Sequence, residues 1–187
     1  MAAYRLDRML GLGMVPVTVA RRDQQSAGMA SYTWWVDDVL MAEKERYDRK
    51  LRAPDPVTWN RQIFIVRVFD QLIYNFDRNL GNLLIDKSWR VWMIDHTRAF
   101  KIFGELRSEK NLNDTWCEAD LLARLRTLEK PALQQAMKDL LIEGQIDGLL
   151  ARRDRIVRLY EQRIAANGEE RVLYHLPSRL AAEAQAH

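Results

Sequence analysis

The chain has 187 residues, about the size of one domain, and a hydrophobic fraction of 48%, which is enough for a core. Its net charge of +3 and its mixed charges argue against long disorder and against a dedicated nucleic-acid binder, so no nucleic-acid partner is expected. The single cysteine, Cys117, excludes a disulfide framework and a C-x-x-C zinc site.

Other compositional signals are equally plain. No apolar run approaches the length of a membrane span, and no secretory leader is visible, so the sequence predicts a soluble cytoplasmic protein. The three histidines, His96, His175 and His187, are too scattered in the sequence to indicate a metal cluster. Oligomeric state cannot be read from these features.

The N-terminal third predicts a helix followed by a β-hairpin. A helical pattern covers residues 2–12, and Gly11 and Gly13 supply its stop signal. Strand-like residues then occur at 15–19 and 29–36, on either side of a polar turn. The expected turn covers residues 23–28. After the second strand come a helix-favouring segment at 37–51 and a linker at 53–56.

The strongest helix prediction covers residues 58–76, whose apolar side chains occur on nearly every face, so this helix should be buried. A short hairpin follows, with strands at 83–85 and 91–94. The remaining expected elements are helices at 118–128, 131–142 and 145–166, a short strand at 172–174 and a frayed alanine-rich tail. The fold class predicted is therefore α+β and mostly helical.

Two groups of side chains have plain structural interpretations. The six tryptophans, including Trp34 and Trp35, are expected in the core and between packed elements. The arginines of the last long helix are expected on its solvated face; they are Arg152, Arg153, Arg155, Arg158 and Arg163.

Residues that can carry chemistry lie between the buried helix and the hairpin. The run is Asn75-Phe-Asp-Arg-Asn-Leu-Gly-Asn82, and the second hairpin strand ends at Asp95. Phosphoryl transfer needs a carboxylate that orients the attacking hydroxyl, oxygen ligands that hold Mg²⁺, and a rigid frame. In kinases the catalytic-loop Asp precedes a metal-binding Asn by five positions, and a second metal-binding Asp follows a short hairpin. Asp77, Asn82 and Asp95 have this arrangement.

Turn chemistry is the alternative interpretation of the same residues. Asp and Asn are common in turns because they bond to nearby backbone and tolerate unusual dihedral angles. D-x-x-x-x-N alone is a weak signal. The buried helix before it and the hairpin after it favour the catalytic interpretation.

The same segments resemble the catalytic core of atypical kinases, which include phosphoinositide kinases, HipA-type kinases and the Golgi casein-kinase family. Phosphoinositide kinases have a D-R-H-x-x-N loop. Residues 77–82 of this chain are similar to it, with Asn79 in place of the His. The Golgi family has A-A-F-H-L-D-R-I-L followed by V-P-P, similar to Ala2-Ala-Tyr-Arg-Leu-Asp-Arg-Met-Leu10 and Val15-Pro16-Val17. Its L-D-N-G-R-G-F motif is similar to Ile94-Asp-His-Thr-Arg-Ala-Phe100.

This resemblance implies a role for each matching position. Asp77 would be the catalytic carboxylate, and Asn82 and Asp95 would bind Mg²⁺ or Mn²⁺ together with ATP. Arg98 would lie near the phosphates, or else be an exposed salt-bridging residue, and His96 would pack in the loop. The adenine-contacting segment that joins the two lobes would be Trp35, Val36 and Asp37.

The resemblance also implies a division of the chain. Residues 1–36 would be a remnant of the N-terminal lobe, with its β-hairpin, and 37–187 the helical C-terminal lobe, with the catalytic loop at 75–82 and the metal-binding hairpin end at 94–100. A glycine-rich phosphate hairpin, a strand Lys and its pairing Glu cannot be placed. In the relatives that Glu lies just before the A-A-F stretch, so an N-terminally truncated gene product, a fragment and a natural single-lobed relic are the alternatives.

Two functions remain open from the sequence. The first is an ATP-dependent phosphotransferase core with an unknown acceptor, weakly active or inactive in this form. The second is a non-catalytic, pseudokinase-type binding or regulatory module. The retained Asp77, Asn82 and Asp95 favour the first, and the missing Lys and glycine-rich hairpin favour the second.

Overall fold

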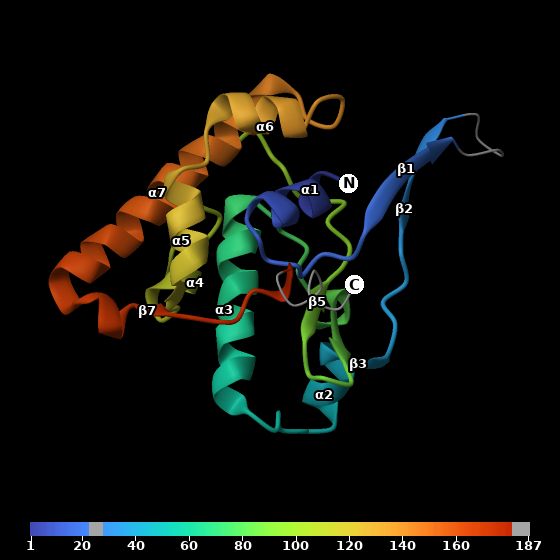
Figure 1. Ribbon diagram of the computed structural model, residues 1–187, viewed down its shortest axis with the longest axis vertical. Helices are drawn as coiled ribbons and strands as arrows, with labels where there is room; N and C mark the ends of the chain where they lie inside the picture. Colours follow the sequence, from blue (N-terminus) through green and yellow to red (C-terminus); the bar gives the residue numbers. More distant parts are fainter. Residues whose placement is uncertain (23–27, 181–187) are drawn as a thin grey trace.

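The structure is a computed structural model, and it describes residues 1–22 and 28–180. Its centre is helix α3 (Pro56–Leu72), which runs through the middle of the molecule in Figure 1. Asp55 caps this helix by accepting hydrogen bonds from the amides of Val57 and Thr58, and Pro56 fits its first turn. Phe69 and Leu72 are fully buried, which confirms that this helix is part of the core.

One side of α3 is covered by a three-stranded antiparallel sheet. Its order is β3 (Val39–Ala42), β4 (Leu83–Asp86) and β5 (Val91–Met93), with Met41 opposite Ile85 and Ile85 opposite Val91. The predicted hairpin is confirmed as β4 and β5. Residues 37–51 were expected to be helical, but they begin as strand β3 and only then form α2 (Glu43–Asp48).

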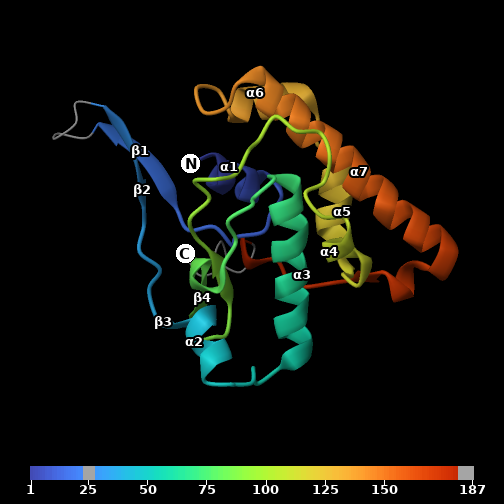
Figure 2. The ribbon, with the colours of Figure 1, turned by 180° about the vertical axis from the view of Figure 1, so that it is seen from behind.

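The N-terminal segment forms helix α1 (Ala2–Met9) and a hairpin of β1 (Thr18–Arg22) and β2 (Met29–Thr33). The hairpin projects away from the rest of the molecule in both Figure 1 and Figure 2. Its first strand begins later than the expected 15–19, because Pro16 has no amide hydrogen for a strand ladder. Most of the expected turn at 23–28 lies outside the described residues, as does most of the alanine-rich tail.

The other side of α3 carries the C-terminal helices (Figure 2). They are α4 (Lys110–Asn113), α5 (Ala119–Arg126), α6 (Lys130–Ala136) and α7 (Glu143–Asn167). Two short strands, β6 (Cys117–Glu118) and β7 (Leu173–Tyr174), pair in parallel beside them. Single 3₁₀ turns, η1 (Leu80–Asn82) and η2 (Glu169–Arg171), complete the element order.

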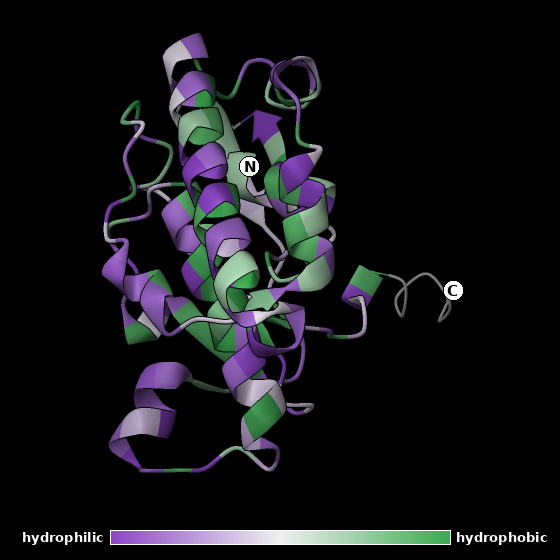
Figure 3. Ribbon diagram, turned by 90° about the vertical axis from the view of Figure 1, so that its left-hand side faces the viewer, coloured by the Kyte–Doolittle hydropathy of each residue, from purple (hydrophilic) through white to green (hydrophobic). Residues whose placement is uncertain are grey.

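Two structural expectations were wrong. Trp34 and Trp35 are 70% and 77% exposed, because they lie in the extended segment after β2 and not in a packed strand. Arg152 is fully buried in α7, whose hydrophilic residues in Figure 3 are interspersed with hydrophobic ones. Its guanidinium donates to the carbonyls of Leu72, Lys101 and Phe103, which offset part of the cost of burying the charge, while Nη2 has no hydrogen-bond partner among the described residues.

The architecture is thus α+β and mostly helical, as the sequence predicts. Cys117 is a free, buried thiol, as expected for a small core residue. Among the described residues, no helix is both long and apolar enough to span a membrane.

Candidate functional site

Arg78 organises the loop between α3 and β4. Its Nε and Nη2 donate to the two carboxylate oxygens of Asp70 in α3, at 2.9 and 3.0 Å. Its Nη1 donates to the carbonyl of Asn82 at 2.8 Å and to that of Ile94 at 2.9 Å. One side chain therefore joins the buried helix, the loop that carries Asp77 and Asn82, and the strand end that precedes Asp95.

Further hydrogen bonds hold the loop against the sheet. The Asn75 side chain donates to Asp70 Oδ1 at 2.9 Å and accepts from the amide of Asp77 at 3.2 Å. The amide of Ile94 donates to the carbonyl of Asn82 at 3.1 Å. The loop at 75–82 and the hairpin end at 94–100, which the sequence separates, are thus adjacent in space.

Asp77 and Asn82 are connected directly. Nδ2 of Asn82 donates to the backbone carbonyl of Asp77 at 3.2 Å, which leaves the amide oxygen of Asn82 for another partner. The Asp77 carboxylate is 43% exposed and lies 3.5 Å from Nε of Arg98, itself 62% exposed. Arg98 thus forms a surface ion pair with Asp77, one of the two roles that the sequence left open.

Asp95 has a left-handed backbone conformation, with φ of 51°. Asp adopts this conformation more readily than most non-glycine residues, and six other described non-glycine residues share it. Oδ1 of Asp95 accepts from the hydroxyl of Thr97 at 2.7 Å and from its amide at 3.3 Å. These bonds lower the pKa of Asp95, so the carboxylate is ionised at neutral pH. Among the described residues, its second oxygen has no hydrogen-bond partner.

His96 packs into the structure behind Asp95. Its ring meets that of Phe69 edge-on, with centroids 6.0 Å apart, and its Nε2 lies 3.0 Å from Nη2 of Arg78. Burial, followed by the nearby Arg78 charge, lowers the pKa of His96 to about 3. The ring is therefore neutral, and its nitrogen accepts a hydrogen bond from the guanidinium.

A cleft of about 660 Å³ opens beside this loop. Its walls come from the start of α1, the base of the β1–β2 hairpin, the segment after β2, the end of β5 and the turn before α7. Trp35, Val36 and Asp95 line it, while Asp37 lines a neighbouring cleft together with Asp86 and Arg90. Asp77, Asn82 and Arg98 are outside its lining, and among the described lining residues none is Lys or Arg.

The comparisons add evidence on the fold. No model of a known protein family matches the chain, and no curated protein matches it. Among solved structures, hydra Fam20 with sugar matches with a TM-score of 0.65 and 16% identity, covering 93% of this chain and 73% of that chain. The fold is kinase-like. The Golgi casein-kinase family, whose motifs the sequence resembles, includes Fam20.

Several residues that shape this kinase-like core were missed in the sequence. Asp70, Asn75 and Arg78 form the polar cluster under the loop, and Asp7 accepts from the amides of Gly13, Met14 and Val15. A signal existed for Asp70, because it is the only acidic residue in a helix that the sequence predicts to be buried. Asp7 gave no such signal, since a charged residue in a short amphipathic helix is usually exposed.

Proposed function

We propose that this chain is the core of an ATP-dependent phosphotransferase, with Asp77 as catalytic carboxylate and Asn82 and Asp95 as ligands of Mg²⁺ or Mn²⁺. The observation that carries the proposal is the placement of Arg78, which donates to the carbonyls of Asn82 and Ile94 at once. It brings the D-x-x-x-x-N loop to the strand end that carries Asp95, as phosphoryl transfer requires.

The residues present fit a divalent cation. The ionised Asp95 has one carboxylate oxygen without a partner among the described residues. Asn82 uses its Nδ2 for the hydrogen bond to Asp77, so its amide oxygen remains available to a cation. Mg²⁺ prefers hard oxygen ligands and retains several waters, so one carboxylate and one amide suffice. When bound, the cation would neutralise charge on the phosphates of ATP.

Asp77 would act as the general base. Its carboxylate is accessible, and the adjacent Asn75 and Asn82 side chains bond to its backbone amide and carbonyl. These two hydrogen bonds fix the backbone of Asp77 and leave its carboxylate available. Asp77 would therefore orient the acceptor hydroxyl and accept its proton. The acceptor would be a protein, a lipid or a small molecule, since kinase-like folds act on all three.

Residues 1–36 and 37–187 would contribute as the remnant N-terminal lobe and the helical C-terminal lobe. The segment Trp35, Val36 and Asp37 would contact adenine, and Trp35 and Val36 line the cleft beside Asp95. No Lys or Arg is found among the described lining residues, so a cationic phosphate contact is missing from this wall. One charge-assisted contact is worth about 1.5–3 kcal/mol, and its loss would weaken ATP binding roughly 10- to 100-fold.

The second candidate function is a non-catalytic binding or regulatory module. The same absence of a Lys or Arg from the described cleft lining favours it. In that case Asp77, Asn82 and Asp95 would maintain the loop through turn hydrogen bonds, which Asn75 and Asn82 already make.

The experiment is a titration with Mg²⁺-ATP followed by NMR, which detects weak binding, together with an ATP-consumption assay. Asp95→Ala should abolish the Mg²⁺-dependent part of the binding, whereas Asp77→Ala should retain nucleotide and lose turnover. Asp48→Ala, at an exposed position in α2, is the matched control. Binding and turnover that are unchanged in Asp95→Ala would eliminate Asp95 as a metal ligand, and a parent chain that neither binds nor consumes ATP would eliminate the phosphotransferase proposal. Binding without any turnover would favour the regulatory module.

A further inference from the structure

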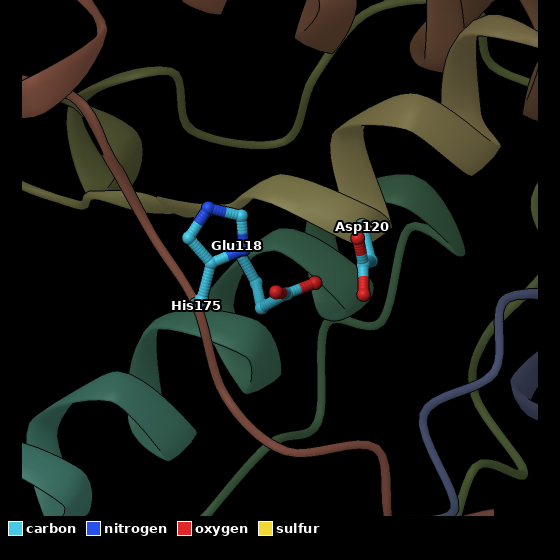
Figure 4. Close-up of side chains that lie close together, drawn as sticks. All are labelled: Glu118, Asp120 and His175. Carbon is cyan, nitrogen blue, oxygen red and sulfur yellow. The ribbon is translucent and has the colours of Figure 1, made fainter. Parts of the chain in front are cut away.

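A second group of ligand-type side chains lies far from the catalytic loop in sequence, at the junction of β6, α5 and β7. Glu118 ends β6, Asp120 is in the first turn of α5, and His175 follows β7. One potential ligand atom from each of the three lies within 4.8 Å of the other two. Figure 4 shows Glu118 between the His175 ring and the Asp120 carboxylate.

Glu118 supplies the most telling observation. The residue is only 6% exposed, and its Oε2 accepts from the amide of Leu121 at 2.7 Å, which is an ordinary helix cap. Its Oε1 is buried and has no hydrogen-bond partner. An unpaired buried carboxylate oxygen is costly, so its presence calls for an additional partner. Helix capping explains one oxygen of Glu118 and leaves the other unexplained.

The backbone already brings the three residues together. Cys117 and Glu118 pair in parallel with Leu173 and Tyr174, so His175 leaves the strand pair beside Glu118. The Tyr174 hydroxyl donates to the carbonyl of Arg61 at 2.6 Å and anchors β7 to α3. Glu118 and Asp120 are thus supported by a paired strand and a helix start, and His175 directly follows the strand that pairs with β6.

We propose that Glu118, Asp120 and His175 bind a divalent transition metal, with Zn²⁺ as the best fit. One imidazole and two carboxylates form a ligand set that suits Zn²⁺, whereas Mg²⁺ and Ca²⁺ prefer oxygen ligands alone. Ligand bonds of about 2.0–2.2 Å place neighbouring donors about 3.4 Å apart, so the three groups must approach by about 1 Å. Asp120 and His175 are exposed, so side-chain rotation can supply this movement.

Water would supply the fourth ligand. A small cavity of about 50 Å³ is lined by Glu118 and Asp120, and this is enough for one or two water molecules. Zn²⁺ with three protein ligands commonly takes water as its fourth ligand. The bound metal would hold the chain after β7 against the start of α5.

Positive charges near the site oppose metal binding and must be outweighed. The α5 N-terminus carries about half a positive charge, and Arg124 and Arg179 line the same small cavity. Arg179 already donates to the carbonyl of Val91 and to the side chain of Gln62. Among the described residues neither Glu118 nor Asp120 forms an ion pair, so both carboxylates remain available to a cation.

The test is calorimetric titration of the full 187-residue chain with Zn²⁺ after chelator treatment. One Zn²⁺ per chain is expected, and Asp120→Asn and His175→Gln should each lower the affinity at least tenfold. Glu118→Gln should do the same, because it keeps an acceptor for the amide of Leu121 and loses the charge. Glu129→Gln, at the exposed start of α6, is the matched control and should bind like the parent chain.

Co²⁺ absorption identifies the ligands independently. Weak ligand-field bands without a thiolate charge-transfer band support the Glu–Asp–His set. A thiolate band, or loss of binding in Cys117→Ser, would assign the metal to the neighbouring thiol and overturn the proposal. Zn²⁺ binding that survives in the double variant Asp120→Asn, His175→Gln would also overturn the proposal. So would a parent chain that binds Zn²⁺ no more tightly than this double variant. Circular dichroism of each variant verifies that the fold is retained.

Discussion

The guanidinium of Arg78 and the carboxylate of Asp70 form a bidentate pair, with Nε–Oδ2 and Nη2–Oδ1 distances of 2.9 and 3.0 Å. Their side chains are only 13% and 10% exposed. A bidentate Arg–carboxylate pair fixes orientation as well as position. The buried helix α3 therefore fixes the position of the loop at 75–82, because Arg78 also donates to the carbonyls of Asn82 and Ile94.

Asp70→Ala should be strongly destabilising, since it leaves the Arg78 charge poorly solvated and without its partner. The expected loss is about 3–5 kcal/mol in the free energy of unfolding, measured by urea denaturation. Asp48→Ala, which breaks the exposed ion pair with Lys44, should cost at most about 1 kcal/mol. Equal losses for the two variants would show that the Asp70–Arg78 pair is unimportant for stability.

Phe69 and Leu72 test whether α3 is the core of the molecule. Both side chains are fully buried, so Phe69→Ala and Leu72→Ala should each cost about 2–5 kcal/mol through lost burial and cavity formation. Val57→Ala in the same helix is the control, because Val57 is 59% exposed. Thermal and urea unfolding should separate the buried pair from the control. A loss as small as that of Val57→Ala would contradict the packing of α3.

Local signals made the loop predictable from the sequence. Asp77, Asn82 and Asp95 lie within a short stretch, and the apolar helix and hairpin that flank them have strong periodic patterns. Strand β3 was missed because Leu40, Met41 and Ala42 favour helices intrinsically. Their extended conformation comes from hydrogen bonds to β4, more than 40 residues later in the chain.

Long-range contacts account for the other differences. The sequence does not reveal that the carbonyls of Leu72, Lys101 and Phe103 converge on Arg152. It likewise separates His175 widely from Glu118 and Asp120, which the β6–β7 pairing brings together. The assignments of Asp77, Asn82, Asp95 and the adenine-contacting segment stay predictions until ligand binding is measured.

Arg152 provides a third prediction. Arg152→Met retains much of the side-chain volume but removes the donors to three carbonyls, so we expect a loss of about 2–5 kcal/mol in the free energy of unfolding. Arg155→Met and Arg158→Met, on the exposed side of α7, should change it by less than about 0.5 kcal/mol. A loss for Arg152→Met as small as those for Arg155→Met and Arg158→Met would indicate that Arg152 is exposed to solvent like the other two.

The last prediction concerns pH and the buried Asp7. Its carboxylate accepts hydrogen bonds from the amides of Gly13, Met14 and Val15, and Met14 in turn accepts from the amide of Met93 in β5. Asp7 therefore fixes the position of residues 13–15, of which Val15 lines the cleft. Burial raises the pKa of Asp7 from 3.8 to about 6, against the opposing effects of these amides and of Arg8.

This raised pKa has a defined sign for stability. Between pH 4 and 6 the folded chain keeps a proton on Asp7 that the unfolded chain has lost, so the free energy of unfolding should fall as pH rises through this window. The contribution of Asp7 should be at most about 3 kcal/mol, since one pKa unit corresponds to about 1.4 kcal/mol. Urea unfolding at several pH values in the parent and in Asp7→Asn isolates it, because Asn does not titrate. Asp48→Asn, at an exposed position, should keep the parental slope. If the three amides outweigh burial, the difference between the parent and Asp7→Asn will have the opposite sign, and stability from Asp7 will instead be lost as pH falls.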